Sequence, residues 1–176
     1  AEEFGGVGVL VNNAAGTFRS DFEDLSPNAW GTIIDINLNG TFNCTRAAGR
    51  HMREAGHGVV INFSSVAALG PSPRTSHYAA SKAAIDSLTQ SLAVEWAEHD
   101  IRVNCIAPGL IATPPVRERL GLDEADLPDR DHVDRHIGFP EEIADVAQFL
   151  ASPAASYLTG HTIVPQGVPP EREEKT

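Results

Sequence analysis

A serine, a tyrosine and a lysine lie close together in the stretch SSVAALGPSPRTSHYAASKAA, residues 64–84. Ser65 precedes Tyr78 by thirteen positions, and Lys82 follows Tyr78 by four. In a helix, Tyr78 and Lys82 share one face and lie roughly 6 Å apart along the axis. An ammonium group near a phenol favours the phenolate and lowers a pKa that starts near about 10. The spacing predicts a proton-transfer site; the alternative is a helix terminus with an exposed tyrosine and a solvated lysine.

Alternating strands and helices must position these side chains. Short β-branched and apolar runs predict strands at 7–13, 58–65, 101–109 and 161–167. Apolar residues at helical spacing predict helices from Pro27 to Gly56, at 77–100, near 115–120 and at 140–152. This alternation predicts an α/β fold with a parallel sheet and helices packed on it. Ser65 then lies at the carboxyl end of a strand, which is the edge where open α/β sheets bind ligands.

The composition excludes several classes of protein. The 176 residues suit one domain, and 41% of them are apolar, which suffices for a core. A net charge of −11 argues against a nucleic-acid partner, because such proteins need a basic surface. No run approaches the ~18 apolar residues of a membrane-spanning helix, so we expect no membrane association. Cys44 and Cys105 are far apart and form no motif, which favours free thiols and a cytoplasmic location.

Six segments of the chain resemble motifs of the short-chain dehydrogenase/reductase family, in that family's order and spacing. They are LVNNAAG (10–16), DINLNGTF (35–42), INFSSVAA (61–68), YAASK (78–82), IRVNCIAPGLIAT (101–113) and FPEEIADVAQFLAS…YLTG (139–160). Together they cover nearly the whole chain except the tail and the loop at 114–138. The resemblance implies a Rossmann-like doubly wound parallel sheet and an oxidoreductase that uses NAD or NADP.

The resemblance also implies roles for four catalytic residues. Tyr78 would be the general acid in carbonyl reduction and the base in alcohol oxidation, and Lys82 would lower its pKa and bind the nicotinamide ribose. Ser65 would polarise the substrate carbonyl, with its neighbour Ser64 as the weaker candidate. Asn37 would hold a water molecule that relays protons from Lys82 to solvent. The alternative for Asn37 is a helical residue bonding its own backbone.

The same resemblance implies a cofactor-binding set in addition to Tyr78 and Lys82. These residues are Asn12, Asn13, Ala14, Ala15, Pro108, Gly109, Ile111 and Thr113. The first four match a turn beside the adenosine half of the cofactor, although alanine replaces the family's glycine and Gly16 follows. The last four match the segment that cradles the nicotinamide, with Thr113 as a hydroxyl donor. The triplet Pro-Gln-Gly at 165–167 departs from the family's usual Asp-Gly-Gly.

The substrate class is less narrowly indicated. NNAAGTF, LSPNAW, LNGTFN and LAVEWAEHDIRVN resemble the branch containing 2,4-dienoyl-CoA reductases, which commonly lack the tyrosine that this chain has at Tyr78. We therefore expect a small-molecule carbonyl or alcohol substrate, an acyl-CoA thioester being compatible, with an enoyl or 2,4-dienoyl-CoA reductase as the alternative. Arg117 and Arg119 could contact a phosphate, but a solvated charged face is favoured. His132 and His136 have helical ligand spacing without a third ligand, so we predict no metal site.

The family's glycine-rich phosphate turn does not occur in these 176 residues. We expect that the N-terminal βαβαβ half of the fold, with the residue that selects NAD or NADP, is missing from this chain. Residues 1–167 would then be the catalytic half of an oxidoreductase domain, and 168–176 a disordered tail. The resemblance implies a homodimer or homotetramer, assembled through helices near 27–54 and 77–98. The alternative is a truncated, non-catalytic chain that acts only in subunit association.

Overall fold

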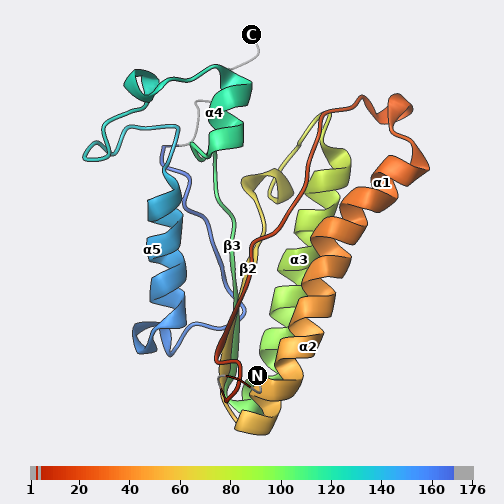
Figure 1. Cartoon of the computed structure of the whole chain (residues 1–176), viewed down its shortest axis with the longest axis vertical. Coiled ribbons are helices and arrows are strands. Elements are labelled where there is room, and N and C mark those ends of the chain that lie inside the picture. Colours follow the sequence, from red (N-terminus) through yellow and green to blue (C-terminus); the bar gives the residue numbers. More distant parts are fainter. Residues whose placement is uncertain (1–2, 4, 169–176) are drawn as a thin grey trace.

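A computed structural model describes residues 3 and 5–168 of the chain. Its four strands form one parallel sheet in the order β1-β2-β3-β4 (Figure 1). They are β1 (Val9–Asn12), β2 (Gly58–Phe63), β3 (Ile101–Ile106) and β4 (Thr162–Ile163). The register aligns Asn12 with Asn62, and Asn62 with Cys105. This architecture confirms the predicted α/β fold with a parallel sheet. The predicted disordered tail lies outside the described residues, except for Val168.

Helices cover both faces of the sheet (Figure 1). On one face lie α1 (Pro27–Ile34), a π-helical segment (Asp35–Asn39), α2 (Gly40–Ala55) and α3 (Ser76–Glu95). On the other face lies α5 (Pro140–Ala151), with α4 (Pro114–Leu120) beyond the carboxyl ends of the strands. Short 3-10 turns occur at Phe22–Asp24, Val66–Ala68, Ala97–His99, Glu124–Asp126 and Pro153–Ala155.

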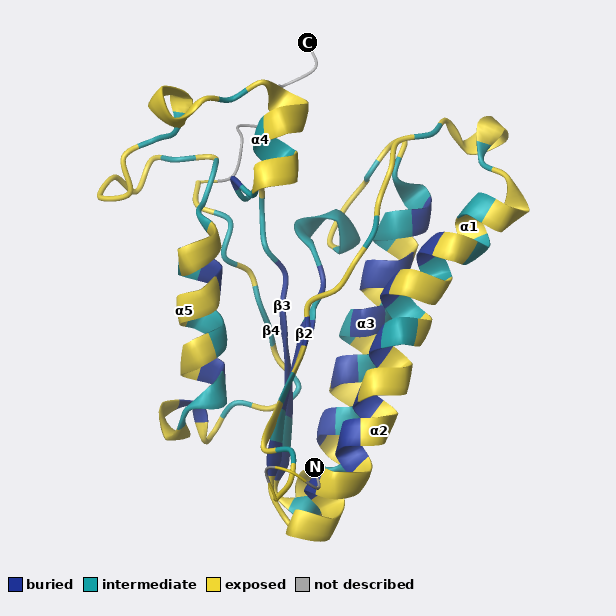
Figure 2. Cartoon of the chain, in the orientation of Figure 1, coloured by how far each residue is buried: buried dark blue, intermediate teal, exposed yellow. Residues whose placement is uncertain are grey.

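Two apolar cores flank the sheet, because successive strand residues point to opposite faces. Val60 and Val103 pack with Met52 of α2 in one core, and all three side chains are fully buried. Ile61 and Ile106 pack with residues of α5 and with Ala155 in the other. Figure 2 shows the mostly buried strands β2 and β3 between two layers of half-exposed helices. Of the described helices, none is long and apolar enough to cross a membrane.

Some element boundaries differ from those predicted. The single helix predicted from Pro27 to Gly56 is divided at 35–39 by the π-helical segment, although it ends as predicted at Gly56, whose φ is 72°. The strand predicted at 161–167 comprises only Thr162–Ile163, the part that pairs with β3. β1 is also shorter than predicted and forms an edge of the sheet, where Val9 and Val11 are 46% and 47% exposed.

Candidate active site

Ser65, Tyr78 and Lys82 come together where β2 ends and α3 begins. Ser65 directly follows β2 as the N-cap of a 3-10 turn, and its hydroxyl accepts a hydrogen bond from the Ala67 amide at 3.2 Å. The same hydroxyl lies close enough to the Tyr78 hydroxyl to lower the pKa of Tyr78. The ammonium nitrogen of Lys82 lies 5.7 Å from the centre of the Tyr78 ring. The structure therefore assembles the three side chains whose spacing predicted a proton-transfer site.

Lys82 is buried rather than solvated, since only 2% of the residue is exposed. Its Nζ atom donates a hydrogen bond of 2.8 Å to the carbonyl oxygen of Phe63, the last residue of β2. Burial lowers the pKa of Lys82 to about 8, because the charged form loses its hydration. An amine with this pKa is largely charged at neutral pH and can exchange a proton slightly above it.

The predicted direction of the Tyr78 pKa shift is wrong in this structure. Burial raises the pKa of Tyr78 above its ordinary value, and the nearby Ser65 hydroxyl lowers it by less. The reason is burial of the phenol, and the Lys82 ammonium group donates its hydrogen bond to the Phe63 carbonyl oxygen. Tyr78 is therefore a neutral phenol at neutral pH, the form that can donate a proton.

Asn37 lies in the π-helical segment and is fully buried. Its side chain accepts a hydrogen bond from the Gly16 amide at 2.8 Å and donates to the Gly16 carbonyl at 3.0 Å. It also donates to the Ser81 hydroxyl, which in turn donates to the Tyr78 carbonyl. The Asn37 side chain therefore bonds groups distant in sequence and not the backbone of its own helix, which was the alternative. Asn37 connects the loop after β1 to the helix that carries Tyr78, and π-helical segments often mark functional sites.

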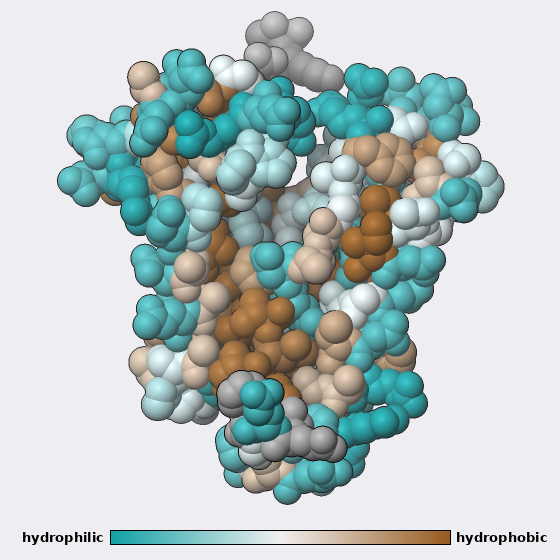
Figure 3. Space-filling model, in the orientation of Figure 1, coloured by the Kyte–Doolittle hydropathy of each residue, from teal (hydrophilic) through white to brown (hydrophobic). Residues whose placement is uncertain are grey.

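A cavity of about 570 Å³ opens between the two helical layers, where Figure 3 shows the surface hollowed. Its lining includes most of the predicted residues: Asn13, Ala15, Ser65, Tyr78, Lys82, Pro108, Gly109, Ile111 and Thr113. Asn12, Ala14 and Asn37 are not in the lining. The cavity is thus bounded by the loops that follow the parallel strands, as expected for a ligand site in an open α/β sheet.

The Asn12 side chain lies in the protein interior, which is why it does not reach the cavity. It donates hydrogen bonds to the Thr45 hydroxyl of α2 and to Asn62 of β2, both at 2.8 Å. Asn62 continues the chain by donating to Thr89 of α3 at 2.9 Å. These buried polar groups satisfy one another and fix the sheet against its helical layer. Asn12 therefore supports the turn, and only Asn13 and Ala15 of that turn reach the cavity.

The segment after β3 packs closely against Pro165 and Gln166. A Cβ atom added at Gly109 would lie 2.7 Å from the Cβ of Gln166, so no side chain fits there. The Gly109 amide donates to the Pro165 carbonyl at 3.0 Å. Pro165 thus holds the predicted nicotinamide-cradling segment through its carbonyl oxygen, and Gln166, which stands where the family has another residue, lies directly against Gly109.

The apolar wall of the cavity was not predicted from the sequence. This wall consists of Val11, Phe63, Pro140, Ile143, Ala144 and Ala147. Four of the six belong to α5 and recur at helical spacing. Their periodicity predicted one side of a helix, but it could not show that this side lines a cavity. Small residues at Ala144 and Ala147 leave space beside the sheet.

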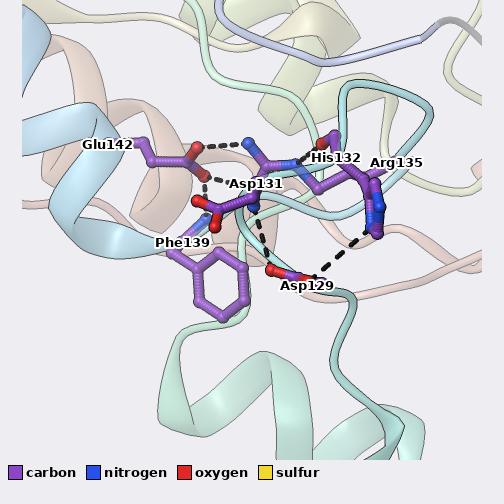
Figure 4. A network of polar contacts seen from close by, with 6 residues as sticks. All are labelled: Asp129, Asp131, His132, Arg135, Phe139 and Glu142. Carbon is purple, nitrogen blue, oxygen red and sulfur yellow. Dashed lines mark hydrogen bonds and ion pairs between the residues drawn. The ribbon is translucent and has the colours of Figure 1, made fainter.

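The loop at the rim of the cavity is anchored to α5 by one ion pair (Figure 4). The Arg135 guanidinium forms two hydrogen bonds to the Glu142 carboxylate and donates a third to the His132 carbonyl at 2.7 Å. Glu142 also accepts from the Phe139 amide at 2.9 Å, capping α5. Hydrogen bonding from Arg135 lowers the pKa of Glu142. Residues 3 and 5–168 contain no group of three metal-ligating side chains, and His132 lies in a loop instead of a helix.

Several known proteins resemble this chain in sequence. A family model described as Enoyl-(Acyl carrier protein) reductase matches residues 1–167. The chain is 45% identical over 168 residues to Short-chain reductase protein NovJ of Streptomyces niveus, covering 92% of this chain and 64% of that protein. It is 42% identical over 166 residues to 3beta-hydroxysteroid dehydrogenase 1 of Eggerthella lenta, covering 93% and 64%. The chain thus spans less than two thirds of the length of these relatives.

A solved structure shares the fold. A gluconate 5-dehydrogenase from Burkholderia cenocepacia J2315, in complex with NADP and tartrate, superposes with a TM-score of 0.82 at 33% identity. The match covers 94% of this chain and 66% of that one. The family model, the sequence relatives and the shared fold establish that this chain belongs to the short-chain dehydrogenase/reductase family.

Proposed function

We propose that this chain forms the catalytic part of an NAD(P)(H)-dependent oxidoreductase that reduces a carbonyl or oxidises an alcohol. The observation that carries the proposal is the convergence of Ser65, Tyr78 and Lys82 on one wall of the cavity. In carbonyl reduction the Tyr78 hydroxyl donates its proton to the substrate oxygen, and in alcohol oxidation it accepts one. Its raised pKa supports the acid role, because the phenol is protonated at neutral pH.

The neighbouring groups assist this transfer. The Ser65 hydroxyl donates a hydrogen bond to the same substrate oxygen and holds it against Tyr78. The buried Lys82 ammonium group supplies positive charge beside the phenol, 5.7 Å from the ring centre, which favours any phenolate that forms. Asn37 holds the loop containing Gly16 against α3 and, in this proposal, positions a water molecule that returns protons from solvent to Lys82.

The residues of the cavity fit the nicotinamide half of a dinucleotide. The Lys82 ammonium and Thr113 hydroxyl are hydrogen-bond donors suited to ribose hydroxyls and a carboxamide, and Ile111 offers an apolar surface to an aromatic ring. Asn13 and Ala15 would flank the adenosine half. When bound, NAD(H) or NADP(H) accepts or supplies the hydride.

The first test replaces Tyr78 by phenylalanine in the protein expressed from its complete coding sequence. Loss of the acid should reduce turnover of carbonyl substrates with NADH or NADPH by roughly 10³-fold. Circular dichroism should show an unchanged fold. Retained turnover would exclude Tyr78 as the acid, and a complete coding sequence without a glycine-rich phosphate turn upstream of Ala1 would contradict the oxidoreductase proposal.

A second candidate, reduction of an enoyl or 2,4-dienoyl thioester, is favoured by the description of the matching family model. In that reaction the proton goes to carbon instead of to a carbonyl oxygen. Assaying a 3-ketoacyl-CoA and a 2-enoyl-CoA of equal chain length in parallel separates the two. We expect turnover of the keto compound or of a simpler carbonyl; turnover of the enoyl compound alone would favour this second candidate.

We also propose that a second copy of this chain binds the outer face of α2 and α3, within the predicted ranges 27–54 and 77–98. A groove of about 300 Å³ lies between these helices, and Phe42, which lines it, is 49% exposed. Light scattering should show a dimer or tetramer that Phe42→Glu dissociates. If the chain associates but neither NADH nor NADPH binds it saturably, the non-catalytic alternative is favoured.

A further inference from the structure

Asp86 lies on the same face of α3 as Tyr78 and Lys82, one helical turn beyond Lys82. Its carboxylate accepts two hydrogen bonds from hydroxyl groups that belong to other elements. The Ser64 hydroxyl, after β2, donates to Oδ2 at 2.7 Å, and the Thr162 hydroxyl of β4 donates to Oδ1 at 2.9 Å. The carboxylate therefore joins three elements of the fold next to the proposed proton-transfer site.

The Asp86 carboxylate is in direct contact with hydroxyl groups and not with a cation: among residues 3 and 5–168, none of the ion pairs includes Asp86. Hydroxyl donors stabilise a carboxylate but leave its charge in place, so the charge acts on the titratable groups nearby. These groups are Lys82 on the same helix and Cys105 on β3.

Of the two groups that could support a charged Lys82, the Cys105 thiol carries no charge near pH 7. Burial lowers the pKa of Lys82 to about 8, and negative charge on Cys105 and on Asp86 opposes that fall. Burial, reinforced by Asp86, raises the pKa of the Cys105 thiol to about 12. The thiol is therefore neutral near pH 7, and the Asp86 carboxylate remains as the balancing charge.

The hydrogen bond to Ser64 adds a positional link to this electrostatic one. The Ser64 hydroxyl lies 2.7 Å from the Asp86 carboxylate and 3.1 Å from the Lys82 carbonyl oxygen, so it joins the end of β2 to both turns of α3. The residue before Ser64 is Phe63, whose carbonyl accepts the hydrogen bond from the Lys82 ammonium group. Asp86 thus holds the strand end that offers Lys82 its acceptor.

We propose that Asp86 is a positioning residue that keeps Lys82 as an ammonium ion on the Phe63 carbonyl, through its charge and through Ser64. The inference rests on the proposed function, in which this ammonium ion assists Tyr78. Asp86 is absent from the cavity lining, so its effect on the proton donor passes through Lys82.

The chain offers a direct measurement, because Lys82 and Lys175 are its only lysines. In a Lys175→Arg background labelled with [13Cε]lysine, one NMR resonance reports the titration of Lys82. We expect the Lys82 pKa to fall by about one pH unit in Asp86→Asn, because an opposite charge nearby favours the charged amine. Glu95→Gln, which removes an exposed charge from the same helix, is the matched control and should leave the pKa unchanged. Equal titration curves for the two variants would overturn the proposal.

Two further measurements keep the proposal open to refutation if Asp86→Asn fails to fold. Asp86→Ser also removes the charge but keeps a hydroxyl for the Ser64 contact, and it should shift the Lys82 pKa in the same direction. The second measurement is the titration of Lys82 in the protein that keeps Asp86. If Lys82 titrates below pH 7 there, the proposal is wrong.

The titration and the activity assay separate this inference from the proposed function. A downward shift in Asp86→Asn together with full activity of Tyr78→Phe would contradict the proposed function and retain the link between Asp86 and Lys82. No shift in Asp86→Asn together with an inactive Tyr78→Phe would contradict this inference alone.

Discussion

The two walls of the cavity are built on different principles. The wall formed by β2 and α3 carries Tyr78 and Lys82, and its polar atoms are buried and tied to backbone or side-chain partners. The wall formed by α5 carries Ile143, Ala144 and Ala147, which provide an apolar surface and free space. A proton donor must be held in one place, whereas an apolar ring needs only a surface of suitable shape. In the proposed function, the first wall would support chemistry at the expense of stability, and the second would support binding with little effect on stability.

Lys82→Met should change the pH dependence of stability most, because it removes the buried charge of the polar wall. The pKa of Lys82 is about 8 in the folded protein and 10.5 in the unfolded chain, so between these values the unfolded state binds more protons. The free energy of unfolding of the wild type should therefore rise by roughly 3 kcal/mol between pH 8 and 10.5, relative to the variant.

Urea unfolding followed by tryptophan fluorescence at several pH values measures this difference. Cys105 also titrates in the alkaline range, with the opposite sign, and it interacts with Lys82, so both proteins should carry Cys105→Ala to remove its contribution. Parallel curves of stability against pH for wild type and Lys82→Met would contradict the assignment of a buried, charged Lys82.

Glu142→Gln should have a smaller and local effect at the rim between the two walls. The substitution removes the charge that holds Arg135, while the amide can still accept from the Phe139 backbone. We expect a loss of about 1 kcal/mol, because both side chains are partly exposed. Hydrogen exchange should accelerate at the amides of Ala112 and Gly138, which join the segment after β3 to this loop.

Amides within α3 serve as the internal reference for that experiment. Their exchange should not change, since the rim loop and the polar wall share no hydrogen bond in the part of the chain that the structure describes. Faster exchange throughout α3 would indicate that the two regions unfold together.

Ala144→Phe should change stability least, by less than about 0.5 kcal/mol, because Ala144 is exposed and faces open space in the cavity. Leu150→Ala on the same helix is the contrasting variant, since Leu150 is fully buried and its truncation should lose about 2–5 kcal/mol. Thermal unfolding of both variants measures the contrast. A large loss in Ala144→Phe would mean that the apolar wall is part of the core instead of a binding surface.

Local patterns in the sequence predicted the order of elements and the groups on the polar wall. Tyr78 and Lys82 are one turn apart on any helix, and Ser65 follows a β-branched run that could only be a strand. The end of α2 at Gly56 was also predicted correctly, because a helix stop depends on the local sequence. The interruption at Asn37 could not be predicted this way, because its partner, the backbone of Gly16, is distant in sequence.

The sequence by itself determined which acidic, basic and hydroxyl groups were available and which of them shared a helix face, because these properties depend on neighbours along the chain. Only the tertiary structure decided that Lys82 is buried on the Phe63 carbonyl, that burial raises the Tyr78 pKa, and that Asp86 meets Ser64 and Thr162. Solvation and charge depend on contacts between elements far apart in sequence, and those contacts exist only once the sheet and its helices have packed.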